Sequence, residues 1–147
     1  MSLFRPLISI LLVFISVIIV SCGDGVQAKA PTYSAAKLAQ IQATNKNVVA
    51  LSDRLPELAT LIENRDWNNV KSFIHGPLGD LRTRMSGLSR ELLPGTKEQA
   101  LALGKEIFVH LNKIDEAAGN NDYKIAIRNY GEALKDFASF EKLIPQA

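Results

Sequence analysis

The sequence predicts an all-α domain, an antiparallel four-helix bundle that runs up, down, up and down. From residue 34 onward, apolar residues recur at steps of three and four, which is the spacing of one helix face. Short polar or Pro-Gly breaks divide this pattern into four segments, and no segment alternates β-branched and polar residues as a strand would. Because short breaks favour antiparallel neighbours, the up-down topology is the simplest arrangement.

The first segment, residues 34–62, has an apolar stripe that is weak at its start and regular later. Ser34 can cap it, because its hydroxyl can accept from the unpaired N–H groups of the first turn. A polar stretch at residues 44–47 weakens the stripe, and Pro56 removes a helical N–H, so we expect a kink or an interruption near Pro56. The apolar positions are Leu38, Ile41, Val48, Leu51, Leu55, Leu58 and Ile62.

The second segment, residues 70–92, has the clearest helical spacing. A polar break at residues 64–66 precedes it, with Asp66 as the expected cap. Pro77 lies in a Gly-Pro-Leu-Gly run at residues 76–79, which predicts a kink where small residues let helices approach. The apolar positions are Val70, Ile74, Leu78, Leu81, Met85, Leu88 and Leu92.

The third and fourth segments follow two further breaks. Pro-Gly at residues 94–95 ends the second segment, and Thr-Lys-Glu-Gln at residues 96–99 predicts a capping box that opens the third. Gly-Asn-Asn-Asp at residues 119–122 closes the third and opens the fourth. The apolar positions are Ala100, Leu103, Ile107, Leu111, Ile114 and Ala118 in the third, and Tyr123, Ile127, Tyr130, Leu134, Phe137, Phe140 and Ile144 in the fourth.

The N-terminus has the pattern of a secretory signal peptide. Arg5 is the only charged residue before Asp24, and residues 7–20 are apolar except for two serines. This run is shorter than the roughly 20 residues that a membrane-spanning helix needs. A short apolar run behind a positive start is typical of a signal peptide. The alternative is an uncleaved N-terminal anchor.

The only cysteine of the chain follows this apolar run. Ile19, Val20, Ser21 and Cys22 resemble the lipobox of bacterial lipoproteins, in which signal peptidase II cuts before the cysteine and the thiol carries a diacylglycerol. The resemblance implies a signal peptide at residues 1–21, with Ile19, Val20 and Ser21 as its recognition sequence, and lipid attachment at Cys22. Residues 22–33 then form a flexible tether, and residues 34–147 form the bundle.

Charge and cysteine content exclude several functions. The full sequence has 17 basic and 15 acidic residues, and the expected cleavage removes only Arg5 from this balance. Near-neutrality is unlike a nucleic-acid-binding protein, which has a strongly basic face. With its only cysteine acylated, the chain can form no disulfide.

The residues that could carry chemistry are few. His110 follows Glu106 by four positions, but no Glu-x-x-His pair occurs, and two ligands are too few for zinc. We therefore expect His110 at the surface or core edge, and His75 beside the kink. No catalytic arrangement, metal site or cofactor motif stands out, so the sequence does not predict an enzyme.

Arg82, Arg84 and Arg90 form a basic stretch without acidic residues, off the apolar stripe or at its margin. Such residues are usually a solvated face. If the protein docks on an acidic partner, these arginines are the expected contact.

Two long stretches of the chain resemble the cyanobacterial PsbQ-like lipoproteins of photosystem II. They are SFIHGPLGDLRTRMSGLSRELLP at residues 72–94 and DFASFEKLIPQA at residues 136–147. The most specific part contains Gly76, Pro77, Leu78, Gly79, Leu81, Arg82, Met85 and Leu88.

This resemblance implies a non-catalytic lumenal subunit with an up-down four-helix bundle and no cofactor. Members of the family bind the extrinsic face of photosystem II and stabilise the oxygen-evolving machinery. The expected partners are the photosystem II core and its other extrinsic subunits, and Cys22 would anchor a monomeric bundle to the thylakoid membrane.

Two alternatives remain open from the residues alone. One is a lipid-anchored helical scaffold, although a tetratricopeptide array would need self-similarity at about 34 residues over three or more repeats, which is missing. The other is a metal-binding lipoprotein built on His75 and His110.

Overall fold

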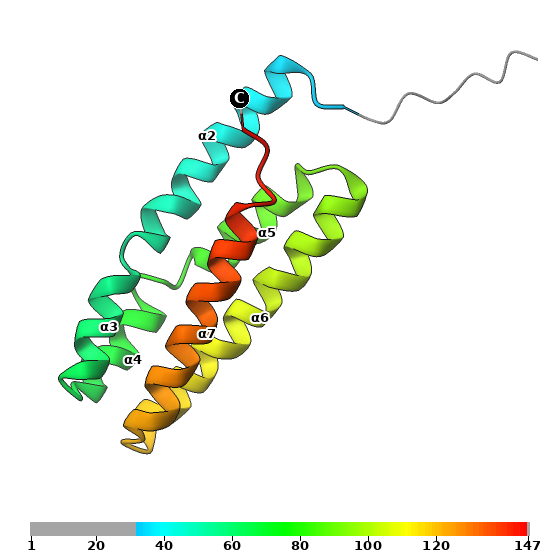
Figure 1. Cartoon of the computed structure of the whole chain (residues 1–147). Helices are drawn as coiled ribbons and strands as arrows, with labels where there is room; N and C mark the ends of the chain where they lie inside the picture. Colours follow the sequence, from blue (N-terminus) through cyan, green and yellow to red (C-terminus); the bar gives the residue numbers. More distant parts are fainter. Residues whose placement is uncertain (1–31, 147) are drawn as a thin grey trace, which may run out of the picture. The chain divides into compact units, whose positions relative to one another are not determined.

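The computed structural model describes residues 32–146, and every regular element in this part of the chain is a helix (Figure 1). The predicted all-α class is therefore confirmed. The elements are α2 (Ala35–Ser52), α3 (Leu55–Glu63), α4 (Trp67–His75), α5 (Leu81–Arg90), α6 (Pro94–Gly119) and α7 (Tyr123–Glu141).

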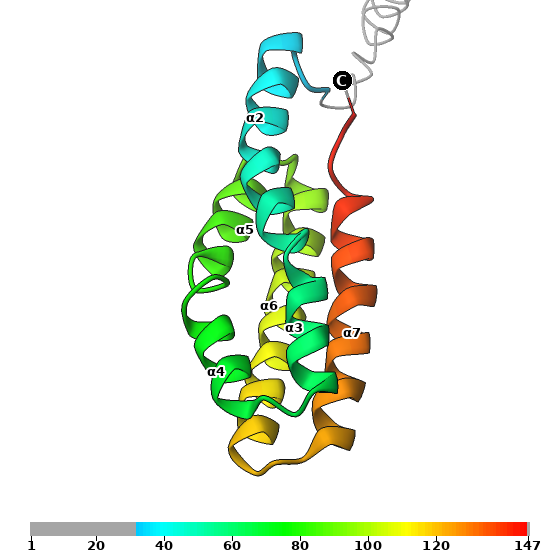
Figure 2. The ribbon, with the colours of Figure 1, turned by 90° about the vertical axis from the view of Figure 1, so that its left-hand side faces the viewer.

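The chain passes four times along the length of the domain (Figures 1 and 2). It runs along α2 and α3, returns along α4 and α5, and then follows α6 and α7 in opposite directions. The pair α6 and α7 forms the most extensive helix packing, while α5 lies between α2 and α6. The first two predicted segments are thus each divided into two helices.

The first division confirms the interruption predicted at Pro56. Helix α2 ends at Ser52, and Pro56 lies in the first turn of α3, where no helical acceptor is available for its missing N–H. The N–H of Asp53 still donates to the carbonyl of Val49 at 2.8 Å, so only one or two residues leave the helical pattern.

The second division, at residues 76–80, depends on two glycines. A Cβ on Gly79 would lie 2.5 Å from the carbonyl oxygen of His75, and one on Gly76 would lie 2.8 Å from that of Ser72. The predicted kink is confirmed, but the reason we expected for it, close approach of another helix, was wrong. The two glycines are needed because the backbone here passes close to the carbonyl groups of the preceding turn of the same chain. The break also brings Leu78 into the core, where it is 2% exposed.

Side-chain caps begin three of the helices, and those at Ser34 and Asp66 confirm the prediction. The side-chain oxygens of Ser34, Asp66 and Asp122 each accept from the backbone N–H three residues further on, at 3.2, 3.4 and 3.0 Å. Each bond satisfies an N–H that has no partner inside its helix.

The start of α6 differs from the prediction. The capping box expected at residues 96–99 does not open the helix, because α6 already begins at Pro94, with Leu93 as its N-cap. Proline suits a first helical position because its fixed φ matches the helix and its missing N–H is not needed there. The Pro-Gly pair therefore starts a helix here.

The core contains side chains from all six helices, and most predicted apolar positions are buried in it. The fourth segment is the exception. Helix α7 buries Ala126, Ala133, Phe137 and Phe140, whereas Leu134 is 39% exposed. Because α7 buries the small side chains of Ala126 and Ala133, its buried face is turned away from the larger side chain of Leu134.

Polar contacts hold the N-terminal part of α2 against the end of α5. The carboxylate of Glu91 accepts from the ammonium of Lys37 at 3.2 Å and from the hydroxyl of Thr44 at 2.9 Å. The hydroxyl of Tyr33 accepts from the N–H of Leu93 at 2.8 Å. Part of the polar stretch at residues 44–47 is thereby explained, because it meets a carboxylate and not an apolar surface.

We expect Gly79→Ala to destabilise the fold by about 1–3 kcal/mol, the usual cost of overpacking a closely packed site. Gly87→Ala is the matched control, because a Cβ at Gly87 in α5 would meet nothing within 4 Å. It should leave the free energy of unfolding unchanged or raise it by up to about 1 kcal/mol. Urea denaturation followed by circular dichroism measures both, and equal stability of the two variants would contradict this account of the break.

Candidate functional site

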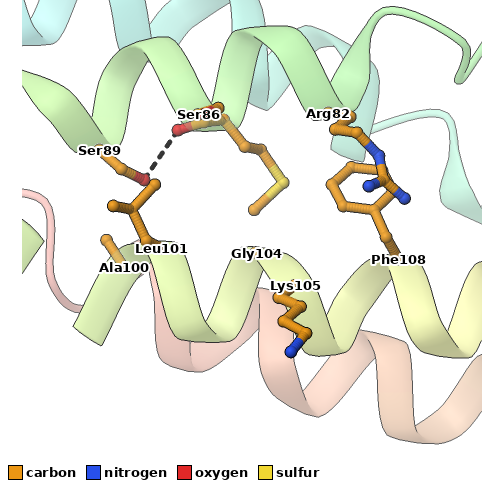
Figure 3. A pocket seen from close by; sticks show the side chains of 9 residues that line it. Arg82, Ser86, Ser89, Ala100, Leu101, Gly104, Lys105 and Phe108 are labelled. Carbon is orange, nitrogen blue, oxygen red and sulfur yellow. Dashed lines mark hydrogen bonds between the residues drawn. The ribbon is translucent and has the colours of Figure 1, made fainter. Parts of the chain in front are cut away.

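A hollow of about 210 Å³ opens between α5 and α6 (Figure 3). Its lining includes Met85 from α5 and Ala100 from α6, both almost fully buried, and Leu101, which is 36% exposed. Gly104 also lines it, and a Cβ added there would meet nothing within 4 Å. The hollow therefore exists because α6 has small residues where it faces α5.

Arg82 lies over the ring of Phe108 at one end of this hollow (Figure 3). The guanidinium carbon is 4.4 Å from the ring centroid, which is a cation–π contact between α5 and α6. Both residues also line a second hollow of about 300 Å³, together with Leu78 and Gly79 from the break before α5. The two hollows form one surface feature, called here the α5–α6 groove.

The arginine and lysine side chains that line the groove are cationic. Arg82 and Lys105 line the first hollow, and Arg82 also lines the second, where His75 lies. No carboxylate lines either hollow, and within residues 32–146 neither Arg82 nor Lys105 forms an ion pair. Asp115 lies near the second hollow, but its carboxylate is 3.0 Å from the Nε2 atom of His75. The groove thus combines apolar side chains with positive charge.

The size of the groove limits what it can hold. Small-molecule sites usually measure about 300–1,000 Å³ and enclose most of the ligand. Taken separately, the two hollows, of about 210 and 300 Å³, lie at or below the lower end of this range, and Arg82 lies between them over Phe108. They suit single side chains of a partner better than a cofactor.

The three arginines singled out in the sequence do not form one cluster. Arg82 lies in the groove, whereas Arg84 pairs with Asp80 of its own helix region at 3.3 Å. At 3.6 residues per turn, two positions correspond to a rotation of roughly 200°, so Arg84 lies on nearly the opposite side of α5. Arg90 is exposed at the last turn of α5.

Sequence reasoning missed Gly104, Lys105 and Phe108. Gly104 carried no distinguishing signal, because Gly87 and Gly131 are also isolated glycines inside helical segments. Lys105 resembled any solvated lysine. Its relation to Arg82 appears only when α5 and α6 are placed side by side.

The two histidines lie apart and contact different partners. His110 on α6 is within 3.0 Å of the amide oxygen of Asn129 on α7, through its Nδ1 atom, and 3.6 Å from the carboxylate of Asp136 through Nε2. The amide nitrogen of Asn129 donates to the carbonyl of Ile125, so its oxygen accepts from Nδ1–H. Asn129 is only 3% exposed, and His110 therefore lies at the core edge, as expected.

Residues 32–146 contain no group of three or more His, Cys, Asp or Glu side chains placed to hold a metal ion. The helices described here are all too short or too polar to cross a membrane. The expected lipid-attachment residue Cys22 and the recognition residues Ile19, Val20 and Ser21 lie outside the described residues.

Several ionisable groups outside the groove have shifted pKa values. The hydrogen bond between Arg54 and Glu57 raises the pKa of the arginine and lowers that of the carboxylate. Lys135 likewise lowers the pKa of Glu132 by hydrogen bonding to it. Burial, and then the charge of Glu63, raises the pKa of Tyr130. The two salt bridges are exposed pairs formed within single helices or their ends.

The described residues thus form an all-α domain whose most distinctive surface is an apolar groove with cationic edges. This combination defines a helical domain without a recognisable catalytic or metal centre in residues 32–146. The model of the PsbQ family, described as oxygen evolving enhancer protein 3, matches residues 5–145. The chain is also 41% identical to CyanoQ of Synechocystis sp. over 148 residues, which cover 100% of this chain and 99% of that protein. The chain therefore belongs to the PsbQ family, the extrinsic subunits of photosystem II, and the resemblance seen in the sequence is confirmed.

If His110 links α6 to α7, His110→Ala and Asn129→Ala should each destabilise the protein by about 1–3 kcal/mol, the cost of leaving a buried polar group unpaired. The double variant should lose less than the sum, because the two residues share one contact. Asn112→Ala is the control, since Asn112 is exposed on α6 and should cost little. Urea denaturation measures all four, and additive losses would show that the contact does not couple the helices.

Proposed function

We propose that this protein is a non-catalytic, lipid-anchored extrinsic subunit of photosystem II on the lumenal side of the cyanobacterial thylakoid membrane. There it would stabilise the oxygen-evolving complex and the other extrinsic subunits. The observation that carries this proposal is the family match over residues 5–145, together with 41% identity to CyanoQ across the chain.

The fold we propose is an up-down-up-down four-helix bundle in which the first and second passes of the chain are each divided into two helices. The path of the chain in Figures 1 and 2 supports it, as do the contacts of α5 with α2 and α6 and those of α3 with α4 and α7. The apolar stripes of all four passes meet in a single core. We further propose that this bundle is monomeric.

The membrane attachment we propose is a diacylglycerol on Cys22. Residues 1–21 would be removed as a signal peptide, and residues 22–33 would tether the domain to the bilayer. The sequence pattern at residues 19–22 supports this. A lipid anchor with two or more acyl chains holds a protein stably, whereas one chain holds it only marginally.

Docking on photosystem II would use the side of α5 that carries Arg82, because Arg82 lines a groove with Lys105. Of the other two arginines considered for this role, Arg84 lies on the other side of α5 and pairs with Asp80, and Arg90 lies outside the groove.

Ser89 is the one serine in the lining of the first hollow that is fully buried, and its hydroxyl donates to the carbonyl of Met85 at 2.8 Å. Because this hydroxyl is not free to act as a nucleophile, the groove fits a non-catalytic role.

The direct test is a pull-down from gently solubilised membranes of the native host, with the full chain carrying a C-terminal affinity tag. Mass spectrometry should identify photosystem II core and extrinsic subunits, and a diacylated peptide that begins at Cys22. Recovery of a lipidated protein without photosystem subunits would overturn the proposed function and leave the anchor standing.

Cys22→Ser should leave the fold intact and weaken retention on membranes, because the domain then keeps only its protein contacts. Thermal unfolding of the purified variant should match that of the tagged wild type. After a high-salt wash, the variant should appear in the supernatant and the wild type in the membrane pellet on immunoblots. Equal retention of the two proteins would contradict a lipid anchor at Cys22.

A further inference from the structure

We propose that the α5–α6 groove binds an acidic segment of a photosystem II subunit. The segment places one large apolar side chain in the first hollow, over Met85 and Gly104, and carboxylates against Arg82 and Lys105. That the partner belongs to photosystem II rests on the proposed function. That the partner segment is acidic and apolar rests on the side chains that line the groove.

The first hollow has an apolar lining with one exposed large side chain, Leu101. Leu101 borders the hollow and is one of two large apolar residues that are exposed in the described part of the chain. The buried residues Met85, Ala100 and Gly104 line the hollow beside it. An inserted apolar side chain would remove the exposed part of Leu101 from water, at roughly 25 cal/mol per Å² buried, and would gain van der Waals contacts with the buried lining.

The charge of the partner follows from the edges of the groove. Because no carboxylate lines either hollow, Arg82 and Lys105 have no opposite charge beside them in the groove. A segment with acidic residues on either side of its apolar one would supply that charge. Complementary charges of this kind set the orientation of a complex and speed its formation.

Arg82 is prepared for this contact by its position. Its guanidinium carbon lies over the ring of Phe108, 4.4 Å from the centroid, and the N–H groups of a guanidinium lie in the plane of that group. Stacking leaves this planar edge able to hold a carboxylate with two parallel hydrogen bonds. Little side-chain freedom remains to be lost on binding, because the stack already holds the side chain.

The groove can be filled from within by a larger side chain at position 104. Gly104→Leu would place a side chain in the hollow, because a Cβ there meets nothing within 4 Å. Gly131→Leu is the matched control: Gly131 lies in the interior of α7, and a Cβ there also meets nothing within 4 Å. Both substitutions replace a helical glycine by a better helix former, so both should be at least as stable as the wild type.

The experiment uses a host strain that lacks the protein and expresses the full-length wild type or one variant. The fraction of each that co-purifies with photosystem II after detergent solubilisation is measured, so that the lipid anchor no longer retains it. Gly104→Leu should lower this fraction by about tenfold, as expected for the loss of one central apolar contact. Gly131→Leu should co-purify like the wild type.

The charge is tested in the same strain with Arg82→Gln combined with Lys105→Gln, against Arg84→Gln as control. The double variant should be released from photosystem II at lower salt than the wild type, and the control at the same salt. Arg84 suits this purpose because it lies on the other side of α5 and pairs with Asp80. If the wild type, the double variant and Arg84→Gln are all released at the same salt concentration, the proposal that the partner segment is acidic is wrong.

A photoreactive benzoylphenylalanine at Leu101 identifies the bound segment, with Leu134 as control because it is similarly exposed, at 39% against 36%. Crosslinks from position 101 should map to a photosystem II peptide with Asp or Glu beside an apolar residue. Crosslinks to a lipid, or to a peptide without acidic residues, would overturn the proposal.

The outcomes separate this inference from the proposed function. If the wild type and Gly104→Leu co-purify equally with photosystem II, the groove assignment is wrong and the function stands. If the wild type itself does not co-purify, both are wrong. If Gly104→Leu instead abolishes binding to vesicles that contain phosphatidylglycerol, the groove binds lipid and the partner protein is excluded.

Discussion

The close approach of the backbone to its own preceding turn at residues 76–80 is the constraint on which the rest of the structure depends. Gly76 and Gly79 permit it, since a Cβ at either position would collide with a carbonyl oxygen one turn earlier. The break brings Leu78 into the core and fixes the start of α5. It thereby sets the register that places Arg82 over Phe108, and with it both hollows of the groove.

Buried or half-buried polar contacts fix the registers of the other helices. Glu91 joins α5 to α2 through Lys37 and Thr44, and Asn129 joins α7 to α6 through His110. Apolar stripes alone can pack in several ways, because burial of apolar surface has no direction. A hydrogen bond that must be made inside the protein excludes most of these arrangements, because an unpaired buried group is costly.

The sequence predicted those features that depend on neighbouring residues in the chain. Helical spacing, the caps at Ser34 and Asp66, and the interruptions at the two prolines are local, and all are confirmed. The start of α6 was misjudged because Pro-Gly is both a stop signal and a good helix start.

The groove could not be predicted, because it depends on contacts between residues far apart in the sequence. Arg82 and Phe108 lie 26 positions apart and face each other only after the break has set α5 against α6. The buried face of α7 was misjudged for a similar reason. Its packing favours alanines at positions 126 and 133 over the larger Leu134, which spacing alone could not show.

Gly104 connects stability with function in this domain. A glycine inside a helix costs roughly 0.5–1 kcal/mol relative to alanine, and no turn or close contact requires one here. Gly87 and Gly131 share this freedom, and Gly104 differs from them because it lines the groove. The cost is small beside the total stability of a domain of this size, about 5–15 kcal/mol, so the fold tolerates it. The lipid anchor proposed at Cys22 would add to the binding by the groove, since a tether raises the effective concentration of the groove near its partner without any further contact.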